Sequence, residues 1–238
     1  MILTILGSSS AGNCYILSNE NESLIIEAGI NINDIKIGLD FKLDKLLGCL
    51  VSHEHGDHSK SVKDLIRLGV DCFASKGTFD ALAIDSHRAH EIKHKHQINL
   101  GNFKILPLTT FHDVAESLGF LIQHPDFGRL LFITDTYQFP YKFAGLNHIL
   151  IEANYSFDLI SKSAIRDRTF TSHMEIDTTL NVLKSNNLGN VHNIILIHLS
   201  DRNSDARLFK LKAQEIAPYS NVEVAASGLI IELKKEAF

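Results

Sequence analysis

The first part of the chain alternates short apolar runs with polar turns, which is the pattern of β-strands. Runs at residues 2–6, 14–17 and 24–27 are separated by Gly-Ser-rich or Asn-rich stretches and predict three strands. Apolar residues at helical spacing over 32–39 predict the first helix. A further apolar run over 46–51 predicts a buried strand that ends at Ser52.

After that strand the pattern predicts a loop that leads into a helix. Ser59 is a favourable N-cap, with Val62 and Leu65 behind it at helical spacing and Gly69 as the stop. The segments that follow are a predicted strand at 71–74, a predicted helix at 76–84 and a stretch without a clear period at 86–97.

The second half of the chain shows the same alternation. The predicted strands are 98–100, 103–111, 118–123, 129–134, 149–152, 193–198, 222–225 and 229–233, and the predicted helices are 156–165, 173–187 and 204–217. Gly101-Asn102 lies between the first two strands and predicts a hairpin. Two packed sheets with helices outside would satisfy this pattern, as would a single mixed sheet. No linker-like stretch interrupts the 238 residues, so we expect one domain over 1–238.

Residues 53–58 read His-Glu-His-Gly-Asp-His and supply four side chains that can bind a metal: His53, His55, Asp57 and His58. So many ionisable groups make a poor core and a poor helix, whereas a divalent cation can hold them together. A solvent-exposed His-rich turn is the alternative, but the full pattern at the end of an apolar strand favours metal. Because an extended backbone points His53 and His55 the same way, and the turn carries Asp57 and His58 to a second position, one loop can serve two metals.

Three further metal-competent side chains follow predicted buried strands. His112 comes after the run that ends at Phe111, Asp135 after the run that ends at Thr134, and His198 at the end of 193–198. Taken singly, each has an ordinary structural explanation as a cap or a satisfied polar contact. Together with the motif loop they complete two coordination shells at the strand edge where α/β proteins usually carry their chemistry.

Composition limits the function classes. The formal net charge of −5 argues against a globally basic nucleic-acid wrapper, although not against a local basic patch. Cys14, Cys49 and Cys72 each lie in or beside an apolar run, which indicates buried free thiols and a cytoplasmic setting. No apolar run approaches the roughly 18 residues of a membrane span, and the N-terminus lacks the pattern of a signal peptide.

With these motifs in order, the chain resembles the metallo-β-lactamase fold superfamily along nearly its whole length. The resemblance implies an α/β (α+β) fold, a four-layer αββα sandwich of two mixed sheets with helices outside. The implied ligands are His53, His55 and His112 for one metal, Asp57, His58 and His198 for the second, and Asp135 as the bridge. An Asp at the bridging position argues against the zinc β-lactamases that use a Cys ligand.

Within the superfamily the chain is most similar to the YycJ/WalJ-type group of exonucleases. The segments that carry this likeness are Gly7-Ser8-Ser9-Ser10-Ala11-Gly12-Asn13-Cys14, Ala74-Ser75-Lys76-Gly77-Thr78, Thr110-Phe111-His112-Asp113, Gly119-Phe120, Ile151-Glu152-Ala153-Asn154 and Ser172-His173. Glu27 departs from the Asp that usually supports the metal loop in this family, and Tyr155 stands where related sequences tend to carry a His. Neither departure removes a metal ligand.

A second set of residues is predicted to meet the substrate. Ser172-His173-Met174-Glu175 matches a capping box, which predicts His173 in the first turn of a helix, where it could contact a phosphate or donate a proton to the leaving oxygen. Asn154, Arg166 and Arg168 are candidate substrate contacts. The segment 86–97 is basic and His-rich and is either a local track for nucleic acid or a mobile solvated loop. We favour the loop, because no aromatic side chains interleave to stack bases.

We therefore expect a dinuclear phosphodiesterase, specifically a DNA nuclease and by resemblance a 5′-to-3′ exonuclease. A metal-bound hydroxide, oriented by Asp57, would attack phosphorus in line. The alternatives are a cyclic-nucleotide phosphodiesterase, a thioester or lactone hydrolase, and a regulatory module without turnover. The expected cofactors are two divalent ions, Zn²⁺ or Mn²⁺. The expected partner is nucleic acid or a nucleotide and not a membrane, and a homodimer is left open.

Overall fold

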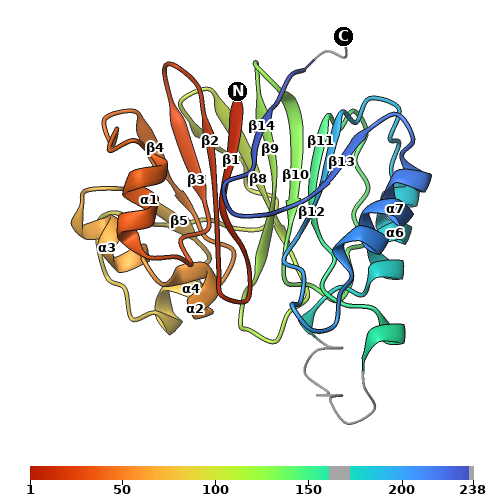
Figure 1. Cartoon of the computed structure of the whole chain (residues 1–238). Coiled ribbons are helices and arrows are strands. Elements are labelled where there is room, and N and C mark those ends of the chain that lie inside the picture. The colour runs from red at the N-terminus through yellow and green to blue at the C-terminus, as the bar shows by residue number, and fades with distance from the viewer. Residues whose placement is uncertain (161–171, 236–238) are drawn as a thin grey trace.

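Two seven-stranded sheets lie face to face in the computed structural model, which describes residues 1–160 and 172–235. Helices cover the outer face of each sheet, so the layers follow the order helix, sheet, sheet, helix (Figure 1). This arrangement confirms the αββα sandwich and excludes the single mixed sheet.

The first sheet is built almost entirely from the first part of the chain. Its strands, in spatial order, are β14 (Ile230–Glu232), β1 (Ile2–Ser9), β2 (Gly12–Ser18), β3 (Ser23–Ile26), β4 (Leu46–Leu50), β5 (Cys72–Ala74) and β6 (Ala89–Glu91). Pairing is antiparallel from β14 to β3 and parallel from β3 to β6.

The second sheet repeats that scheme. Its strands, in spatial order, are β7 (Ile98–Leu100), β8 (Phe103–Thr109), β9 (Leu118–His124), β10 (Gly128–Ile133), β11 (His148–Glu152), β12 (Asn193–Ile197) and β13 (Asn221–Val224). Pairing is antiparallel from β7 to β10 and parallel from β10 to β13. Consequently β4, β8, β10, β11 and β12 bring their carboxyl ends to one end of the sandwich (Figure 1).

The helices fall into two groups. Against the first sheet lie α1 (Ile32–Gly38), α2 (Gly56–Ser59), α3 (Val62–Arg67) and α4 (Lys76–Ala81), and against the second lie α6 (Ile176–Ser185) and α7 (Ala206–Ile216), with a short 3-10 helix η1 (Phe157–Leu159) near the sheet edge. None of the helices in the described part of the chain is both long and apolar enough to cross a lipid bilayer.

Alternation along each strand divides the apolar residues between layers. In β10, Leu130 and Phe132 enter the core between the sheets, whereas Leu131 and Ile133 face α6 and α7. Tyr15 from the first sheet meets Phe132 edge-on across the inner core, with ring centroids 5.3 Å apart. Burial on both faces explains why the central strands read as continuous apolar runs and not as alternating ones.

Most predicted strands are confirmed within one or two residues, and the helical predictions needed more correction. Ser59 is the last residue of α2 and not an N-cap, because its hydroxyl donates to Glu54 O and His55 O, at 2.7 and 3.0 Å. Helix α6 begins after Glu175, whose carboxylate caps it, so the capping box at Ser172 is wrong.

Two further segments differ from the prediction. Only η1 is seen within the predicted helix at 156–165, the rest of which lies mainly outside the described residues. The irregular segment 86–97 contains the short strand β6.

Candidate metal centre

The seven predicted ligands come together at the carboxyl ends of the strands. His53 and His55 follow β4, Asp57 and His58 lie in α2, and the remaining three follow β8, β10 and β12, namely His112, Asp135 and His198. Three groups of side chains are close enough to hold a metal ion: His53 with His55, His112 and Asp135; Asp57 with His58 and His198; and Asp135 with Glu152, His173 and His198.

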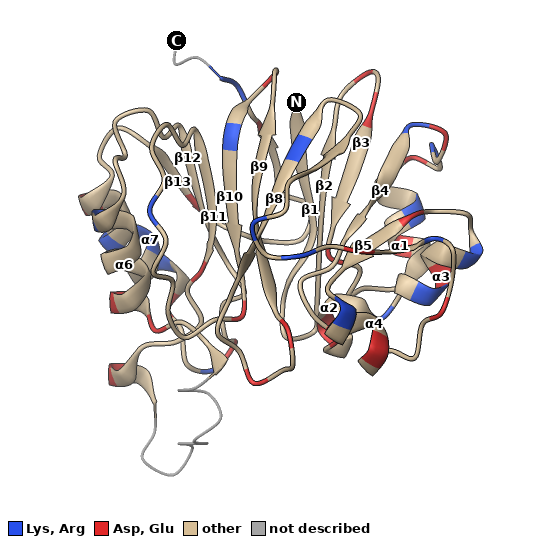
Figure 2. Cartoon of the chain, turned by 180° about the vertical axis from the view of Figure 1, so that it is seen from behind, with Lys and Arg blue, Asp and Glu red and all other residues tan. Residues whose placement is uncertain are grey.

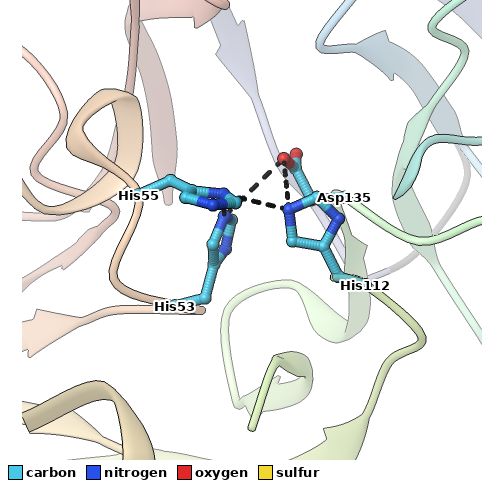
Figure 3. A group of neighbouring side chains, drawn as sticks. All are labelled: His53, His55, His112 and Asp135. Atoms are coloured by element: carbon cyan, nitrogen blue, oxygen red, sulfur yellow. Dashed lines mark hydrogen bonds and ion pairs between the residues drawn. The ribbon is translucent and has the colours of Figure 1, made fainter. Parts of the chain in front are cut away.

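Three imidazoles and one carboxylate form the first cluster (Figure 3). His55 Nδ1 lies 2.9 Å from His53 Nε2 and 3.0 Å from His112 Nε2, so three ring nitrogens face one another. Asp135 Oδ2 lies 3.7 Å from His53 Nε2 and 3.6 Å from His112 Nε2. The second oxygen of Asp135 is left to face other residues.

The other oxygen of Asp135 faces the second cluster. Asp135 Oδ1 is 3.4 Å from both His58 Nε2 and His198 Nδ1. Asp57 Oδ2 lies between the same two rings, 3.4 Å from His58 Nε2 and 3.3 Å from His198 Nε2. The Asp135 carboxylate therefore faces both clusters, which is the geometry that a bridging ligand requires.

Hydrogen bonds on the outer sides of the rings fix which nitrogens point inward. His112 Nδ1 lies 2.7 Å from the carbonyl oxygen of Ser172, which can only accept, so this nitrogen carries the proton. The Nε2 atom of the neutral ring then presents a lone pair to the first cluster. His53 Nδ1 contacts the Ser52 hydroxyl at 2.8 Å on the side away from the cluster.

The ionisation states suit divalent cations. Burial lowers the pKa of His53 and of His112, which keeps both rings neutral and able to bind metal. Burial raises the pKa of the Asp57 carboxyl, but its contacts with His198 and His58 outweigh burial and hold that pKa well below its usual range. Burial lowers the pKa of His198, yet Asp135, Asp57 and Glu152 outweigh it and raise the pKa to about 10. A cation entering the second cluster would replace a proton on His198.

The donor set fits two divalent metals. Imidazole nitrogens and carboxylate oxygens in this mixture are typical ligands of Zn²⁺ and Mn²⁺. Two histidine nitrogens lie 2.9 and 3.0 Å from a third, beside a carboxylate, an arrangement that a divalent cation would stabilise. The clusters of described residues are therefore able to bind metal ions.

Residues at the carboxyl end of β3 contact the loop that carries His53, His55, Asp57 and His58. The buried Glu27 carboxylate accepts a hydrogen bond from Ser52 N at 3.2 Å, and its other oxygen lies 3.4 Å from His58 Nδ1. Ala28 N donates to His58 O, and Ser61 N donates to Ala28 O, both at 2.8 Å. The Glu27 side chain therefore supports the His58 ring, although it is one methylene longer than the Asp that is usual at this position.

The opening loop between β1 and β2 holds the same element from the other side. The Asn13 amide donates to Asp57 O at 3.1 Å and lies 3.2 Å from His58 Nε2. Ser8 Oγ accepts a hydrogen bond from His198 N at 3.0 Å. Sequence reasoning identified this loop as part of the family likeness but did not predict these contacts.

Three residues at the site have a strained backbone. Glu27, Asp135 and His198 have φ values of 66°, 45° and 53°, in the left-handed region that residues other than glycine rarely adopt. Each comes directly after or close to the end of a buried strand. Such conformations cost about 1–3 kcal/mol each and persist where the surroundings enforce them, as they do at functional sites.

His173 belongs to the third of these groups, but it does not lie in the first turn of a helix as predicted. It precedes α6 and is held by Glu152, whose Oε1 accepts from His173 Nδ1 at 2.7 Å. Burial lowers the pKa of His173, but the charge and hydrogen bond of Glu152 outweigh it and raise that pKa. Glu152, fully buried at the end of β11, was not singled out from the sequence, although its position at a strand end is the signal that identified Asp135.

A cavity of about 590 Å³ opens over these groups and is lined by residues of both clusters, by His173 and by Asn154. The Asn154 amide donates to His198 O at 2.8 Å, so it braces the second cluster at the cavity wall. Arg166 and Arg168, the other candidate substrate contacts, lie outside the described residues.

Comparison with known proteins gives a consistent picture. A family profile described as "Beta-lactamase superfamily domain" matches residues 37–199, a span that contains all seven clustered ligand candidates. Exodeoxyribonuclease WalJ of Streptococcus pneumoniae is 27% identical over 172 residues, and exodeoxyribonuclease YycJ of Bacillus anthracis is 23% identical over 173 residues. Each alignment covers 66% of this chain and 64% of the relative, so the chain matches somewhat less than two thirds of the relatives' length.

Solved structures share the fold at low sequence identity. The metallo-β-lactamase fold protein YhfI from Bacillus subtilis superimposes with a TM-score of 0.74 at 16% identity, over 97% of this chain and 99% of YhfI. The short form of human tRNase Z superimposes with a TM-score of 0.65 at 14% identity, over 98% of this chain and 99% of the enzyme. At these identities the likeness concerns the fold alone.

Proposed function

The chain belongs to the β-lactamase superfamily, as the family match over residues 37–199 shows, and from this premise we propose that it is a metal-dependent phosphodiesterase that acts on DNA as a nuclease. The observation that carries the proposal is the convergence of five imidazoles and two carboxylates on two adjoining clusters with Asp135 between them. The two exodeoxyribonuclease relatives support DNA as the substrate.

In this proposal each cluster holds one divalent ion. His53, His55 and His112 would hold the first, Asp57, His58 and His198 would hold the second, and Asp135, which faces both clusters, would contribute to each. Two such ions supply an acidified water at neutral pH and neutralise the charge that builds up on a phosphodiester. An oxygen bridge in place of a sulfur makes the site hard and suited to phosphate oxygens.

The chain's own groups supply orientation and proton transfer. Asp57 lies at the cavity wall with its carboxylate ionised, where it can orient the attacking water. His173 lines the cavity while its Nδ1 donates to Glu152, and the charge of Glu152 raises the pKa of His173, which favours the protonated ring. His173 is therefore suited to protonate the leaving oxygen. Asn154 and Ser8 brace His198 and so hold the second cluster in place.

We also propose a cytoplasmic location, which is supported by three cysteines that are buried and unpaired. A reducing compartment keeps such thiols free. The metal remains Zn²⁺ or Mn²⁺ in this proposal, because imidazole and carboxylate ligands accept both.

The proposal is tested by measuring metal content and hydrolysis together. Purified protein is loaded with Zn²⁺ or Mn²⁺ and given end-labelled single- and double-stranded DNA, structured RNA, cyclic nucleotides and a thioester. We expect DNA to be degraded, with product length separating exonuclease from endonuclease action. Digestion of cyclic nucleotides without any polymer, or of the thioester alone, would contradict the nuclease.

The matched variants are His55→Ala and His87→Ala. His55 lies at the centre of the first cluster, whereas His87 is exposed and outside the three clusters. We expect His55→Ala to lose about one bound metal per chain and to lower kcat on DNA at least 100-fold, because a metal supplies several kcal/mol of charge stabilisation. We expect His87→Ala to keep its bound metal and its kcat on DNA. Unchanged activity in His55→Ala would refute the mechanism.

A further inference from the structure

We propose that a basic turn at residues 93–96, together with aromatic residues 137–141, forms a binding path for single-stranded nucleic acid that leads to the metal clusters. The proposal rests on the nuclease function above and specifies how its substrate is held. It takes up the basic, His-rich segment that the catalytic site does not use.

Positive charge is concentrated in this part of an otherwise acidic chain. The turn reads Lys-His-Lys-His at 93–96. Lys93 pairs with Glu91 at 3.1 Å, so Lys95 is the cation of the turn whose charge is less directly offset. The connection between the two sheets carries blue along its course in Figure 2. A local basic strip of this kind is what a nucleic-acid backbone needs, whatever the net charge of the chain.

The turn is docked on the second sheet by hydrogen bonds. Lys95 N donates to Pro107 O at 2.9 Å, and Thr109 N donates to His94 Nδ1 at the same distance. His96 N closes the turn onto Lys93 O at 3.0 Å. These bonds occupy the edge of β8 beyond its pairing with β7. Lys95 adopts a strained φ of 61°, and strain that the surroundings enforce is typical of functional positions.

Aromatic side chains reach the turn from a distant segment, which removes the reason for rejecting a nucleic-acid track. Tyr141 lies with its ring centroid 5.7 Å from that of His94, and Lys95 Nζ lies 6.0 Å from the Tyr141 centroid. Phe139 packs edge-on against Tyr141, with centroids 5.1 Å apart, and fixes its orientation. An aromatic ring beside a lysine can stack a base while the cation meets the adjoining phosphate.

The path is continuous with the catalytic side. Tyr137 is 40% exposed, and its ring lies 5.9 Å from that of Phe111, the residue before His112. Tyr137 N donates to Phe111 O at 3.1 Å, which ties the aromatic segment to the loop that carries His112. Tyr137 therefore links the loop of His112 to the segment 137–141, whose Tyr141 contacts the basic turn.

A cavity next to the turn could receive an unstacked base. It has a volume of about 440 Å³ and is lined by Lys93, His94, Ile92 and the two flanks of the His112 loop, including Thr109 and Val114. Its lining is mixed: Ile92, Val114 and Leu118 offer apolar surface to a flat ring, and Lys76, Glu91 and Glu116 also line it. A duplex hides the faces of its bases within the stack, so stacking rings and a base-sized cavity favour a single strand.

The test compares five variants of the metal-loaded protein. Tyr141→Leu removes the ring but keeps an apolar side chain against the sheet, and Tyr141→Phe restores the ring. Tyr219→Leu and Lys36→Ala are the controls, because Tyr219 is 98% exposed and both residues lie outside the path. Lys95→Ala removes the cation. Binding is measured by fluorescence anisotropy with a labelled phosphorothioate thymidine 12-mer, both single-stranded and in a blunt duplex with its complement. Turnover is measured with the ordinary forms of both and with thymidine 5′-p-nitrophenyl phosphate.

We expect Tyr141→Leu to raise both the Kd and the KM for the single-stranded 12-mer about fivefold or more, with a smaller effect on the mononucleotide ester, and Tyr141→Phe to reverse the change. Lys95→Ala should reduce the slope of log Kd against log salt by about 0.7, the value for one lost phosphate contact on a single strand. Both controls should match the unaltered protein.

Two outcomes would overturn the path. In one, Tyr141→Leu and Lys95→Ala bind and degrade the 12-mer as well as the controls do, which leaves the nuclease proposal intact. In the other, the loss is equal for a blunt duplex and the single strand, which refutes the single-strand preference. Failure of the unaltered protein to degrade any DNA while it still binds the 12-mer would contradict the nuclease and not the path.

Discussion

At the scale of single residues, Glu152 has a role that depends on its charge and not only on its shape. One oxygen accepts from His173 Nδ1 at 2.7 Å, and the other accepts from Thr136 N at 3.0 Å. The first bond selects the tautomer of His173 and keeps its pKa raised. The second bond joins Glu152 to the loop that carries Asp135, so one buried carboxylate aligns a proton donor with the proposed metal bridge.

We therefore expect Glu152→Gln to lower kcat by about 10- to 100-fold with little change in KM, the usual effect of removing a group that orients a metal or acid–base residue. In the proposed mechanism a protonated His173 is needed for activity, so we expect activity to fall as pH rises through its pKa. Without the negative charge of Glu152 that pKa falls, and the alkaline limb of the pH–rate profile moves to lower pH. The profile is measured with the thymidine ester.

Glu22→Gln is the matched control, because Glu22 is also a buried, hydrogen-bonded glutamate but contacts His124 and Asn102 and no residue of the three clusters. The alkaline limb of the pH–rate profile of Glu22→Gln should lie at the same pH as that of the unaltered protein. An unshifted limb in Glu152→Gln would show that His173 is not the group that titrates.

Residue chemistry could be predicted unevenly from the sequence. The donors in 53–58 were visible because three imidazoles and a carboxylate within six residues have few other uses. Glu152 was not, since a single carboxylate at a strand end is usually a cap. The orientation of the His112 ring depends on the carbonyl of Ser172, 60 residues away in sequence, and no local pattern encodes such a contact.

At the scale of elements, the short helix α2 is held by a backbone contact that leaves no room for a side chain. A Cβ atom added to Gly29 would lie 1.7 Å from Asp57 O and 2.8 Å from His58 N. Both are backbone atoms, so the clash cannot be relieved by a change of rotamer. The close approach requires glycine at position 29, and it sets the height of Asp57 and His58 above the sheet.

We expect Gly29→Ala to push α2 away from the end of β3 and to weaken binding at the second cluster more than at the first. Metal titration should show about a tenfold or larger loss of affinity at one of two sites, by analogy with the effect of disturbing groups that orient ligands. Far-ultraviolet circular dichroism should remain that of a folded sandwich.

Gly56→Ala provides the control for this backbone clash. A Cβ at Gly56 meets nothing within 4 Å, although the residue lies in α2 itself. This variant should bind both metals as the unaltered protein does. Equal metal affinities in Gly29→Ala and the unaltered protein would mean that α2 tolerates displacement.

Helices and strands with a long apolar pattern could be predicted from the sequence, whereas the residues at which they begin and end could not. Strand β12 and helix α7 match their predictions closely because each has a long apolar pattern. The start of α6 was misplaced because Ser172-His173-Met174-Glu175 satisfies the local capping rule. In the fold, Ser172 O accepts from His112, its hydroxyl is buried, and Glu175 caps the helix instead. A contact between distant residues overrides the local preference.

At the scale of the whole molecule, the sequence left open whether the strands form one sheet or two. Central strands such as β10 and β12 are buried on both faces, so their apolar runs do not reveal which face meets the other sheet. The family resemblance decided that question correctly. Pairing partners far apart in sequence, such as β1 with β14, leave no mark in a local pattern.

The end of the sandwich opposite the metal clusters contains a buried histidine that makes stability depend on pH. His148 Nε2 donates to Lys234 O at 3.1 Å, and its Nδ1 accepts from Asn193 Nδ2 at 3.0 Å. Burial lowers the pKa of His148 to about 4. Between pH 6.5 and 4 the unfolded chain takes up a proton that the folded protein excludes, so this residue destabilises the fold progressively on acidification.

We expect His148 to remove up to about 3 kcal/mol of unfolding free energy between pH 7 and pH 4, from a shift of roughly 2.5 pKa units at 1.36 kcal/mol each. His148→Gln keeps a donor near Lys234 O but does not titrate. Urea unfolding of the unaltered protein and of His148→Gln at several pH values isolates the contribution of His148 to the unfolding free energy, because the other titrating groups are common to both proteins. Parallel pH dependences would refute this assignment.

The place of β14 bears on the order in which the protein can be made. During synthesis β1 emerges well before β14, its neighbour on the outer side and the last strand in the described part of the chain. Until then the outer edge of β1 offers unpaired amide and carbonyl groups to any other nascent chain. Ribosome-bound chains stalled before β14 should therefore recruit holding chaperones, and release of the binding should coincide with the emergence of residues 230–232.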